Sequence, residues 1–419
     1  METVNTLTSL LASYQPGMSL PQRFYIDEAV FEAEMQSVFK TQWLFAGHSC
    51  EVAKPGEYFT FSLGHESLIV IRDQSGILRV HFNVCRHRGS KLVWSDRGCT
   101  KALVCPYHGW TYQLDGELKA ARFMGETFNC KDFPLVSAHV RELAGLVFVC
   151  LAPEPPDFES AVNAIGSQLV PHRFDQAKVI VRDHYTVNAN WKTILENNRE
   201  CYHCQVAHPE FMVTNYDAGL PGDDRPINRH FQALKAAANQ RWEAMGLQAC
   251  NADYLDGSWC RAARFPLRDG CVTESLHGRM TAPLMGDLPS EDVGSLRIIG
   301  LPNFWGHANA DYGMTTQVIP ISPSETEVIV AFLVREDAVA GVDYSPEDVA
   351  AVWRITSEQD WQICESNYAG IRSSIYQPGH LSLAMEGLLA EFIDWYLQCM
   401  KENVNVNENV NFEGFLASG

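Results

Sequence analysis

Short apolar runs separated by turn-forming residues dominate the first part of the chain. They predict four strands, over residues 58–62, 67–71, 78–82 and 146–151. Residues 73–76, Asp-Gln-Ser-Gly, have the composition of a hairpin turn between the second and third of these strands. The Pro-rich segment 152–156 is typical of a linker, so we expect a small β domain over residues 42–155.

Longer elements follow the linker. The pattern predicts strands over 179–185 and 328–334 and helices over 192–207, 346–370 and 383–401. Strands and helices in separate runs indicate an α+β fold with a second domain over residues 156–400. Residues 1–41, with a helix over 28–39, are expected to form a helical lead-in that packs on the second domain. Residues 401–419 form a tail, whose Asn/Val repeat at 403–411 is expected to be disordered or an added strand.

Four metal-binding side chains occur in the β domain as Cys85-x-His87 and, after seventeen intervening residues, Cys105-x-x-His108. Two thiolates and two imidazoles suit a Rieske [2Fe–2S] cluster, in which cysteines bind one iron and histidines bind the other. A zinc site can also use two cysteines and two histidines, but both cysteines then usually come first. The alternating order, with Gly89 and Gly109 allowing a close backbone approach, favours the cluster.

A second candidate metal site lies beyond the linker, at His203 and His208. Five residues on a regular helix would point the two imidazoles in different directions. Pro209 disfavours helical backbone at His208, so we expect the helix to end there and to bend. A bent helix end can bring both imidazoles to one metal. Two histidines and one carboxylate form the facial triad of non-heme Fe(II) oxygenases.

These motifs resemble those of the Rieske non-heme iron oxygenases, in the segments 83–90, 105–110 and 190–209. The resemblance covers most of the chain and implies a catalytic domain built from an antiparallel sheet and helices. It implies that Asp360, in a segment similar to the family's late helix, completes the iron site, with Glu358 and Glu365 as alternatives. It also implies that Glu200 bridges the cluster of one subunit to the iron of its neighbour in a homotrimer.

The composition limits the binding partners and the cellular location that we expect. Lys and Arg number 32 against 51 Asp and Glu, a net charge of −19 that argues against nucleic acid or an anionic membrane as partner. No apolar run is long enough to span a membrane, and the N-terminal segment lacks the pattern of a secretory signal. We therefore expect a cytoplasmic protein in which two of the thirteen cysteines bind the cluster and the rest are reduced, and we expect no redox or zinc role for the pair Cys201 and Cys204.

The chain lacks the familiar glycine-rich motif for nicotinamide or flavin binding and the plant-type ferredoxin motif. Electrons should therefore come from a separate NAD(P)H-dependent reductase that contains flavin and iron–sulfur centres.

The segments 196–210, 376–382 and 392–396 resemble the glycine betaine monooxygenase branch, whose relatives act on proline betaine, choline or carnitine. The resemblance implies hydroxylation of an N-methyl group, followed by loss of formaldehyde. Aromatic faces attract a quaternary ammonium group, and we expect Phe211, Trp305 and Tyr312 to line such a pocket. No arginine can be singled out for a carboxylate. Gly109 departs from the branch pattern, as do residues 205–207, which leaves the individual substrate open.

Three other functions fit part of the pattern. A ring-hydroxylating aromatic dioxygenase would share both metal sites. A Rieske electron carrier would need no second metal site and no long chain beyond the linker. A regulatory protein with an inactive oxygenase fold would not need His203, His208 and Asp360 together.

Overall fold

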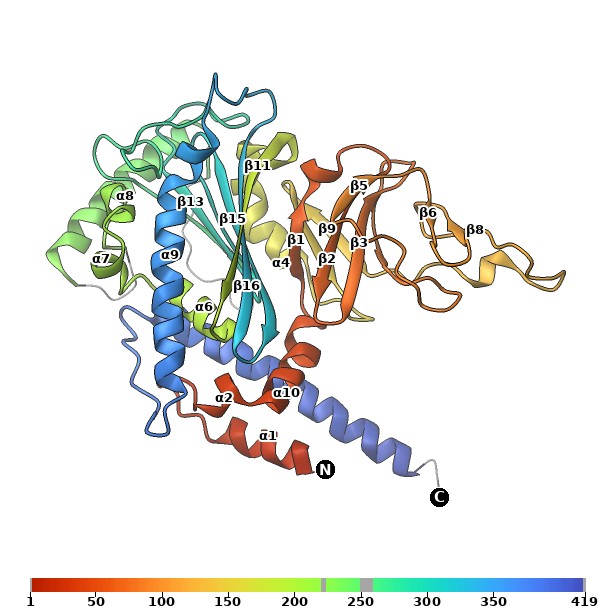
Figure 1. Cartoon of the computed structure of the whole chain (residues 1–419). Coiled ribbons are helices and arrows are strands. Elements are labelled where there is room, and N and C mark those ends of the chain that lie inside the picture. The colour runs from red at the N-terminus through yellow and green to blue at the C-terminus, as the bar shows by residue number, and fades with distance from the viewer. Residues whose placement is uncertain (1, 220–223, 249–258, 417–419) are drawn as a thin grey trace.

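The computed structural model describes residues 2–219, 224–248 and 259–416 (Figure 1). The expected α+β class is confirmed: antiparallel strands form several sheets, and long helices flank the largest of them. In the described part of the chain, none of the helices combines the length and the apolar character needed to cross a membrane. The cytoplasmic location and the domain boundaries at 42, 156 and 401 stay predictions.

The N-terminal β-rich part contains three small sheets. The first has the order β1 (Leu44–His48), β10 (Leu146–Cys150), β9 (His139–Leu143). The second has the order β4 (Leu78–Phe82), β3 (Glu66–Arg72), β2 (Glu57–Leu63), β5 (Arg97–Cys99). The third has the order β6 (Leu103–Val104), β7 (Thr111–Tyr112), β8 (Leu118–Ala120). The four predicted strands of this region and the 73–76 hairpin turn are confirmed, since β3 pairs with β4 from Arg72 and Leu78 outward.

The C-terminal part is built on one six-stranded antiparallel sheet. Its order is β11 (Ala177–Val187), β16 (Glu325–Arg335), β15 (Gly313–Ser322), β14 (Phe304–Ala308), β13 (Ser295–Gly300), β12 (Cys260–Phe265). The helix α9 (Pro346–Ile371) lies across one face of this sheet (Figure 1). Ser345 caps α9 by accepting from the backbone N–H of Asp348, and Pro346 occupies its first turn, where a missing N–H costs nothing.

The helix α6 (Trp191–Asn198) carries the chain from β11 towards the metal site. Its side chains are fixed to the N-terminal lead-in, which contains α1 (Glu2–Ala12), α2 (Arg23–Ile26), α3 (Glu28–Glu34) and η1 (Met35–Phe39). Lys192 Nζ lies 2.5 Å from Glu34 Oε1, and both side chains are fully buried. Tyr25 donates a 2.9 Å hydrogen bond to Glu196. A buried charge without its partner is strongly destabilising, so these pairs fix the position of α6 against the N-terminal lead-in.

Two predicted helices differ from the structure. The last helix, α10, runs over Gly387–Leu416, so it starts later than residue 383 and includes the segment predicted to be disordered or an added strand. Once the packed body of a helix exists, each further residue adds one hydrogen bond at low cost, which overrides the weak helix preference of Asn and Val. The expected continuous helix over 192–207 is also wrong, for a reason given below.

Candidate iron–sulfur and mononuclear metal centres

Two loops of the same construction carry the first set of metal-binding residues. The backbone N–H of Gly89 donates to the carbonyl of Cys85 at 2.9 Å, and that of Gly109 donates to the carbonyl of Cys105 at 3.0 Å. Both glycines have positive φ, +81° and +71°, a conformation that other residues rarely adopt. The glycine spacing seen in the sequence therefore closes each loop directly behind its metal-binding residues.

The two loops bring the four predicted cluster residues together. The Nδ1 atoms of His87 and His108 face each other at 3.1 Å. The thiols of Cys85 and Cys105 are buried, and Cys85 Sγ lies 3.3 Å from the hydroxyl of Tyr112. Thiols beneath the surface and imidazoles at it match a cluster with cysteines on the inner iron and histidines on the outer iron. The donor set therefore fits a Rieske cluster.

Aromatic rings hold the two imidazoles in place. The ring of His87 stacks on Trp110, with centroids 4.9 Å apart and planes 7° apart. The ring of His108 stacks on Tyr107 at 3.8 Å, and Arg88 covers Tyr107 from 5.2 Å. The side chain of His108 is exposed, so a partner molecule can approach this edge of the centre.

The second site begins where α6 ends, at Asn198. The short helix α7 (Cys204–Ala207) starts only after a turn, and the reason is Glu200. Its carboxylate accepts from the backbone N–H of Tyr202 and, at 3.4 Å, from that of His203. Local side-chain-to-backbone bonds of this kind compete with helical hydrogen bonds, which explains the break within the expected helix. The predicted helix end before Pro209 is confirmed.

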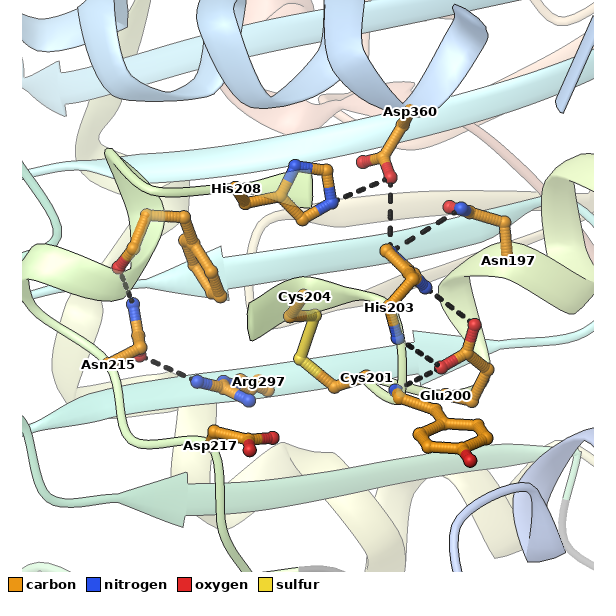
Figure 2. The surroundings of a disulfide bond; sticks show 12 residues. Asn197, Glu200, Cys201, His203, Cys204, His208, Asn215, Asp217, Arg297 and Asp360 are labelled. Carbon is orange, nitrogen blue, oxygen red and sulfur yellow. Dashed lines mark hydrogen bonds and ion pairs between the residues drawn. A yellow bond between two sulfur atoms is a disulfide. The ribbon is translucent and has the colours of Figure 1, made fainter. Parts of the chain in front are cut away.

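The turn and α9 bring three donor atoms to one point (Figure 2). Asp360 Oδ1 lies 3.3 Å from His203 Nε2 and 3.0 Å from His208 Nε2. Neighbouring donors on an octahedral ion with bonds of about 2.1 Å are separated by roughly 3 Å. The alternative carboxylates lie elsewhere on α9: Glu358 is exposed, and Glu365 accepts from the backbone and side chain of Asn188.

Hydrogen bonds on the far side of each imidazole fix which nitrogen faces the centre. His203 Nδ1 donates to Glu200 Oε1 at 2.5 Å, and His208 Nδ1 donates to Gln359 Oε1 at 2.9 Å. Gln359 is held in turn by Glu210, which accepts from its Nε2 at 3.0 Å. With Nδ1 protonated, each Nε2 presents a lone pair, as metal-binding histidines do. Gln359 has no motif that sequence reasoning could have used.

The unpaired carboxylate oxygen tests whether a metal fits. Asp360 Oδ1 is buried between the two imidazoles yet makes no hydrogen bond of good geometry, as expected of an atom that faces a cation. Burial lowers the pKa of His203, but the neighbouring carboxylates of Asp360 and Glu200 outweigh it and raise this pKa to about 9, which shows that the site favours a positive charge. The donors therefore fit a divalent iron.

The disulfide between Cys201 and Cys204 corrects the expectation that all cysteines outside the cluster are reduced. The turn after Glu200 sets the two Cα atoms 5.0 Å apart, within the range that a disulfide bridges. The Cys204 sulfur also lies within 4.8 Å of donor nitrogens of His203 and His208. Because this sulfur is bonded to Cys201, it offers no thiolate, and Asp360 remains as the third donor.

A cavity of about 560 Å³ opens from the donor atoms and extends between the sheet and α9. Phe211 and Trp305 line it as predicted, but Tyr312 does not. Tyr312 is fully buried one layer behind, where its hydroxyl accepts from Trp353 Nε1 at 2.8 Å. Trp353 lines the cavity in its place. Its position seven residues before Asp360, on the same face of α9, is a signal that the sequence contained.

A β-rich domain with a Cys₂His₂ loop pair and a sheet-and-helix domain with a two-histidine, one-carboxylate site together define the class of Rieske-type iron oxygenases. Comparison with known proteins agrees. Residues 42–134 match the family model of the Rieske [2Fe-2S] domain, and residues 174–402 match that of the ring hydroxylating alpha subunit (catalytic domain). The chain belongs to this family of oxygenase alpha subunits, and its cofactors are a Rieske [2Fe–2S] cluster and a mononuclear iron.

Within this family, the chain is similar to oxygenase subunits of monooxygenases. The chain is 40% identical to the glycine betaine monooxygenase oxygenase subunit of Chromohalobacter salexigens, over 93% of this chain and 88% of that protein. It is also 40% identical to the protein of the same name from Pseudomonas aeruginosa, over 94% of this chain and 92% of that protein. It is 35% identical to the carnitine monooxygenase oxygenase subunit of Escherichia coli, over 48% and 54% of the two chains.

Solved structures share the fold. A quaternary ammonium Rieske monooxygenase superposes with a TM-score of 0.71 at 22% identity, covering 93% of this chain and 97% of the other. Naphthalene 1,2-dioxygenase from a Rhodococcus species gives a TM-score of 0.66 at 18% identity, covering 95% and 98%. Since the monooxygenase and the dioxygenase share this fold, the fold alone leaves the substrate open.

Proposed function

We propose that this chain is the oxygenase component of an N-demethylating system that acts on a betaine. Dioxygen, two protons, and two electrons from a separate NAD(P)H-dependent flavin and iron–sulfur reductase convert an N-methyl C–H bond into C–OH, and the second oxygen atom leaves as water. The N–CH₂OH group then loses a proton and breaks its C–N bond, which releases formaldehyde and the demethylated amine. The observation that carries this proposal is the 40% identity to two glycine betaine monooxygenase oxygenase subunits over nearly the whole chain.

The residues take the following roles in this proposal. Cys85, His87, Cys105 and His108 hold the [2Fe–2S] cluster, and His203, His208 and Asp360 hold the iron. The bound iron supplies open coordination positions at which dioxygen is activated. Glu200 and Gln359 keep the imidazoles in the tautomer that binds metal, through hydrogen bonds of 2.5 and 2.9 Å.

The cavity wall beside the donors suits a trimethylammonium group. Phe211, Trp305 and Trp353 present aromatic surface there, and the rings of Phe211 and Trp353 are 5.4 Å apart. An ammonium that sheds its water against such rings gains about 2 kcal/mol from cation–π attraction. The hydrogen bond between Trp353 Nε1 and Tyr312 fixes one ring of this wall. The wall would hold the methyl groups near the iron while keeping bulk water away.

Electron delivery supports a homotrimer in this proposal. The cluster loops beside β6 lie on one side of the folded molecule, and α7, with the second metal site, lies on the opposite side (Figure 1). Electrons would therefore cross from the cluster of one subunit to the iron of its neighbour, through Glu200. Mixing His108→Ala chains, which lack a cluster ligand, with Asp360→Ala chains tests this. Restored turnover in reassembled mixtures is expected, whereas a fully active monomer in sedimentation would contradict it.

Formaldehyde release tests the function itself. Iron-loaded protein is supplied with NADH and a generic reductase and offered glycine betaine, proline betaine, choline and carnitine, with benzoate as the aromatic control. Formaldehyde from a betaine, in proportion to the NADH consumed, is the expected result. Silence with every ammonium compound, together with a cis-diol from benzoate, would assign the chain to ring hydroxylation instead. Oxidation of choline with no turnover of glycine betaine, proline betaine or carnitine would replace the substrate class, because choline alone lacks a carboxylate.

A further inference from the structure

The cavity is lined by side chains of both charges. The metal end contains the carboxylates Glu200 and Asp360 beside the aromatic wall. The basic side chains that line the cavity are Arg199, which neighbours Glu200 in the chain, and Lys235, Arg261 and Arg297, which come from α8 (Pro226–Ala244), β12 and β13. Figure 2 shows Arg297 on the opposite side of the Cys201–Cys204 disulfide from Asp360; Asp217, drawn next to Arg297, pairs with Arg225 at 2.7 Å. Such a cavity matches a zwitterion rather than a simple cation.

Of these basic side chains, three are engaged with the protein. Arg199 donates a 2.6 Å hydrogen bond to Asn198 Oδ1 and makes a further interaction. Arg261 forms an ion pair with Glu391, so its charge is already compensated. Lys235 Nζ lies 4.7 Å from the ring centre of Phe265 and makes a further interaction as well. Arg297 differs, because its one hydrogen bond among the described residues goes to a neutral amide: Nη2 donates to Asn215 Oδ1 at 2.7 Å.

The guanidinium of Arg297 has hydrogen-bond donors that no described residue accepts from. Among the residues that the structure describes, it makes a single hydrogen bond, and its Nε is buried without any partner. Burial lowers the pKa of Arg297, as expected when a cation is only partly compensated. Yet 28% of the side-chain surface remains open, and the side chain lines the cavity. Phe211 and Phe265 hold it from two sides, with ring centres 5.7 and 4.7 Å from its Cζ.

The nearest carboxylate, that of Glu274, does not accept a hydrogen bond from Arg297. Glu274 Oε1 lies 3.9 Å from Arg297 Nη2, which is beyond hydrogen-bonding distance. The other oxygen of Glu274 accepts from Asn309 at 3.2 Å and lies 2.9 Å from His307 Nδ1. Glu274 is fully buried, so it gives long-range compensation to Arg297 without occupying its donors. A small anion in the cavity would therefore meet unsatisfied N–H groups.

We infer that Arg297 binds the carboxylate of the substrate and so selects a zwitterionic betaine over an ammonium compound without an acid group. This inference rests on the proposed function and adds the residue that decides the substrate class. The carboxylate accepts hydrogen bonds from the guanidinium, and the trimethylammonium end is thereby directed along the cavity to the aromatic wall and the metal donors. A site that leaves donors unpaired with a neutral analogue discriminates against that analogue.

The test compares one betaine with its carboxamide, in which the acid is replaced by a neutral group of similar size. Wild-type protein, Arg297→Met, Arg297→Lys and Arg261→Met are each assayed for formaldehyde release with both compounds, and KM and kcat are determined separately. Arg297→Met is expected to raise KM for the acid on the order of 10- to 100-fold and to leave KM for the amide within a few fold. Arg297→Lys should fall between, because a lysine cannot reproduce the planar fork.

Each outcome either supports or overturns the proposed role of Arg297. Turnover of the amide by Arg297→Met shows that the variant is folded and metal-loaded, so the loss with the acid is specific. An equal rise in KM for both compounds, or loss of acid preference in Arg261→Met instead, would overturn the role of Arg297 while formaldehyde release by the wild type keeps the proposed function. Absence of formaldehyde from the wild type with every betaine would overturn the proposed function, and the inference with it.

Discussion

Replacing Asp360 by alanine tests the assignment of the second metal site most directly. Asp360 Oδ1 is 3.3 Å from His203 Nε2 and 3.0 Å from His208 Nε2, and it is the sole carboxylate oxygen recorded in contact with both nitrogens among the described residues. Its removal leaves two imidazoles and no anionic donor. The Rieske loops lie on the opposite side of the folded molecule (Figure 1), so the cluster should form normally.

The expected magnitude follows from the role of each contact. Loss of a group that merely orients a ligand lowers metal affinity 10- to 100-fold, and Asp360 is placed to be a ligand itself. We therefore expect a loss of more than about 100-fold, equivalent to roughly 3 kcal/mol. Desalted protein should then contain about two irons per chain in place of about three.

The assay is iron content per chain, together with the visible spectrum of the cluster and formaldehyde release. Glu358→Ala and Glu365→Ala are matched controls, because they remove carboxylates from the same helix at positions outside the donor set. Both should keep the third iron, the spectrum and the turnover. Retention of about three irons and normal turnover in Asp360→Ala, or loss of iron in either control, would refute the ligand assignment.

Three further predictions concern the surroundings of the site. Glu200→Gln should leave both metal centres bound while coupled turnover is lost, and unchanged turnover would mean that electrons take another route. Gln359→Leu removes the acceptor for His208 Nδ1 and should lower iron affinity 10- to 100-fold in a chelator competition, whereas a wild-type affinity would deny it a positioning role. Burial, opposed by the hydrogen bond from Tyr25, raises the pKa of Glu196 from 4.5 to about 7, so the contribution of Glu196 to stability is largest below pH 4.5 and is lost as the pH rises to about 7. Glu196→Gln should remove this contribution of up to about 3 kcal/mol, and the same difference in stability between the two proteins at every pH would contradict it.

The cluster loops could be predicted from the sequence because each is a local structure. Cys85 and Gly89, like Cys105 and Gly109, are joined by one short turn, and the residue types of that turn set its geometry. Similarly, His203 and His208 lie on one bent segment, although the sequence placed the bend at Pro209 and missed the earlier break caused by Glu200. Strands such as β2 and β3 were also predictable, since each reflects a local apolar pattern.

The third donor and the substrate end of the cavity depended on packing between distant segments. Asp360 lies 152 residues after His208, and residue type alone could not separate it from Glu358 or Glu365. The rotation of α9 against the sheet decides which carboxylate faces the histidines, and that rotation is set by burial along the whole helix.

The sequence by itself therefore determined the class of the protein, the cluster residues and the two histidines, because those signals are contained in short segments. Only the tertiary structure decided that Tyr312 lies behind the cavity wall and that Arg297 has hydrogen-bond donors without partners among the described residues. The surroundings of Tyr312 and Arg297 depend on which side chains meet across the sheet and α9. Such meetings follow from the packing of the complete chain, because no local pattern specifies the partner on another element.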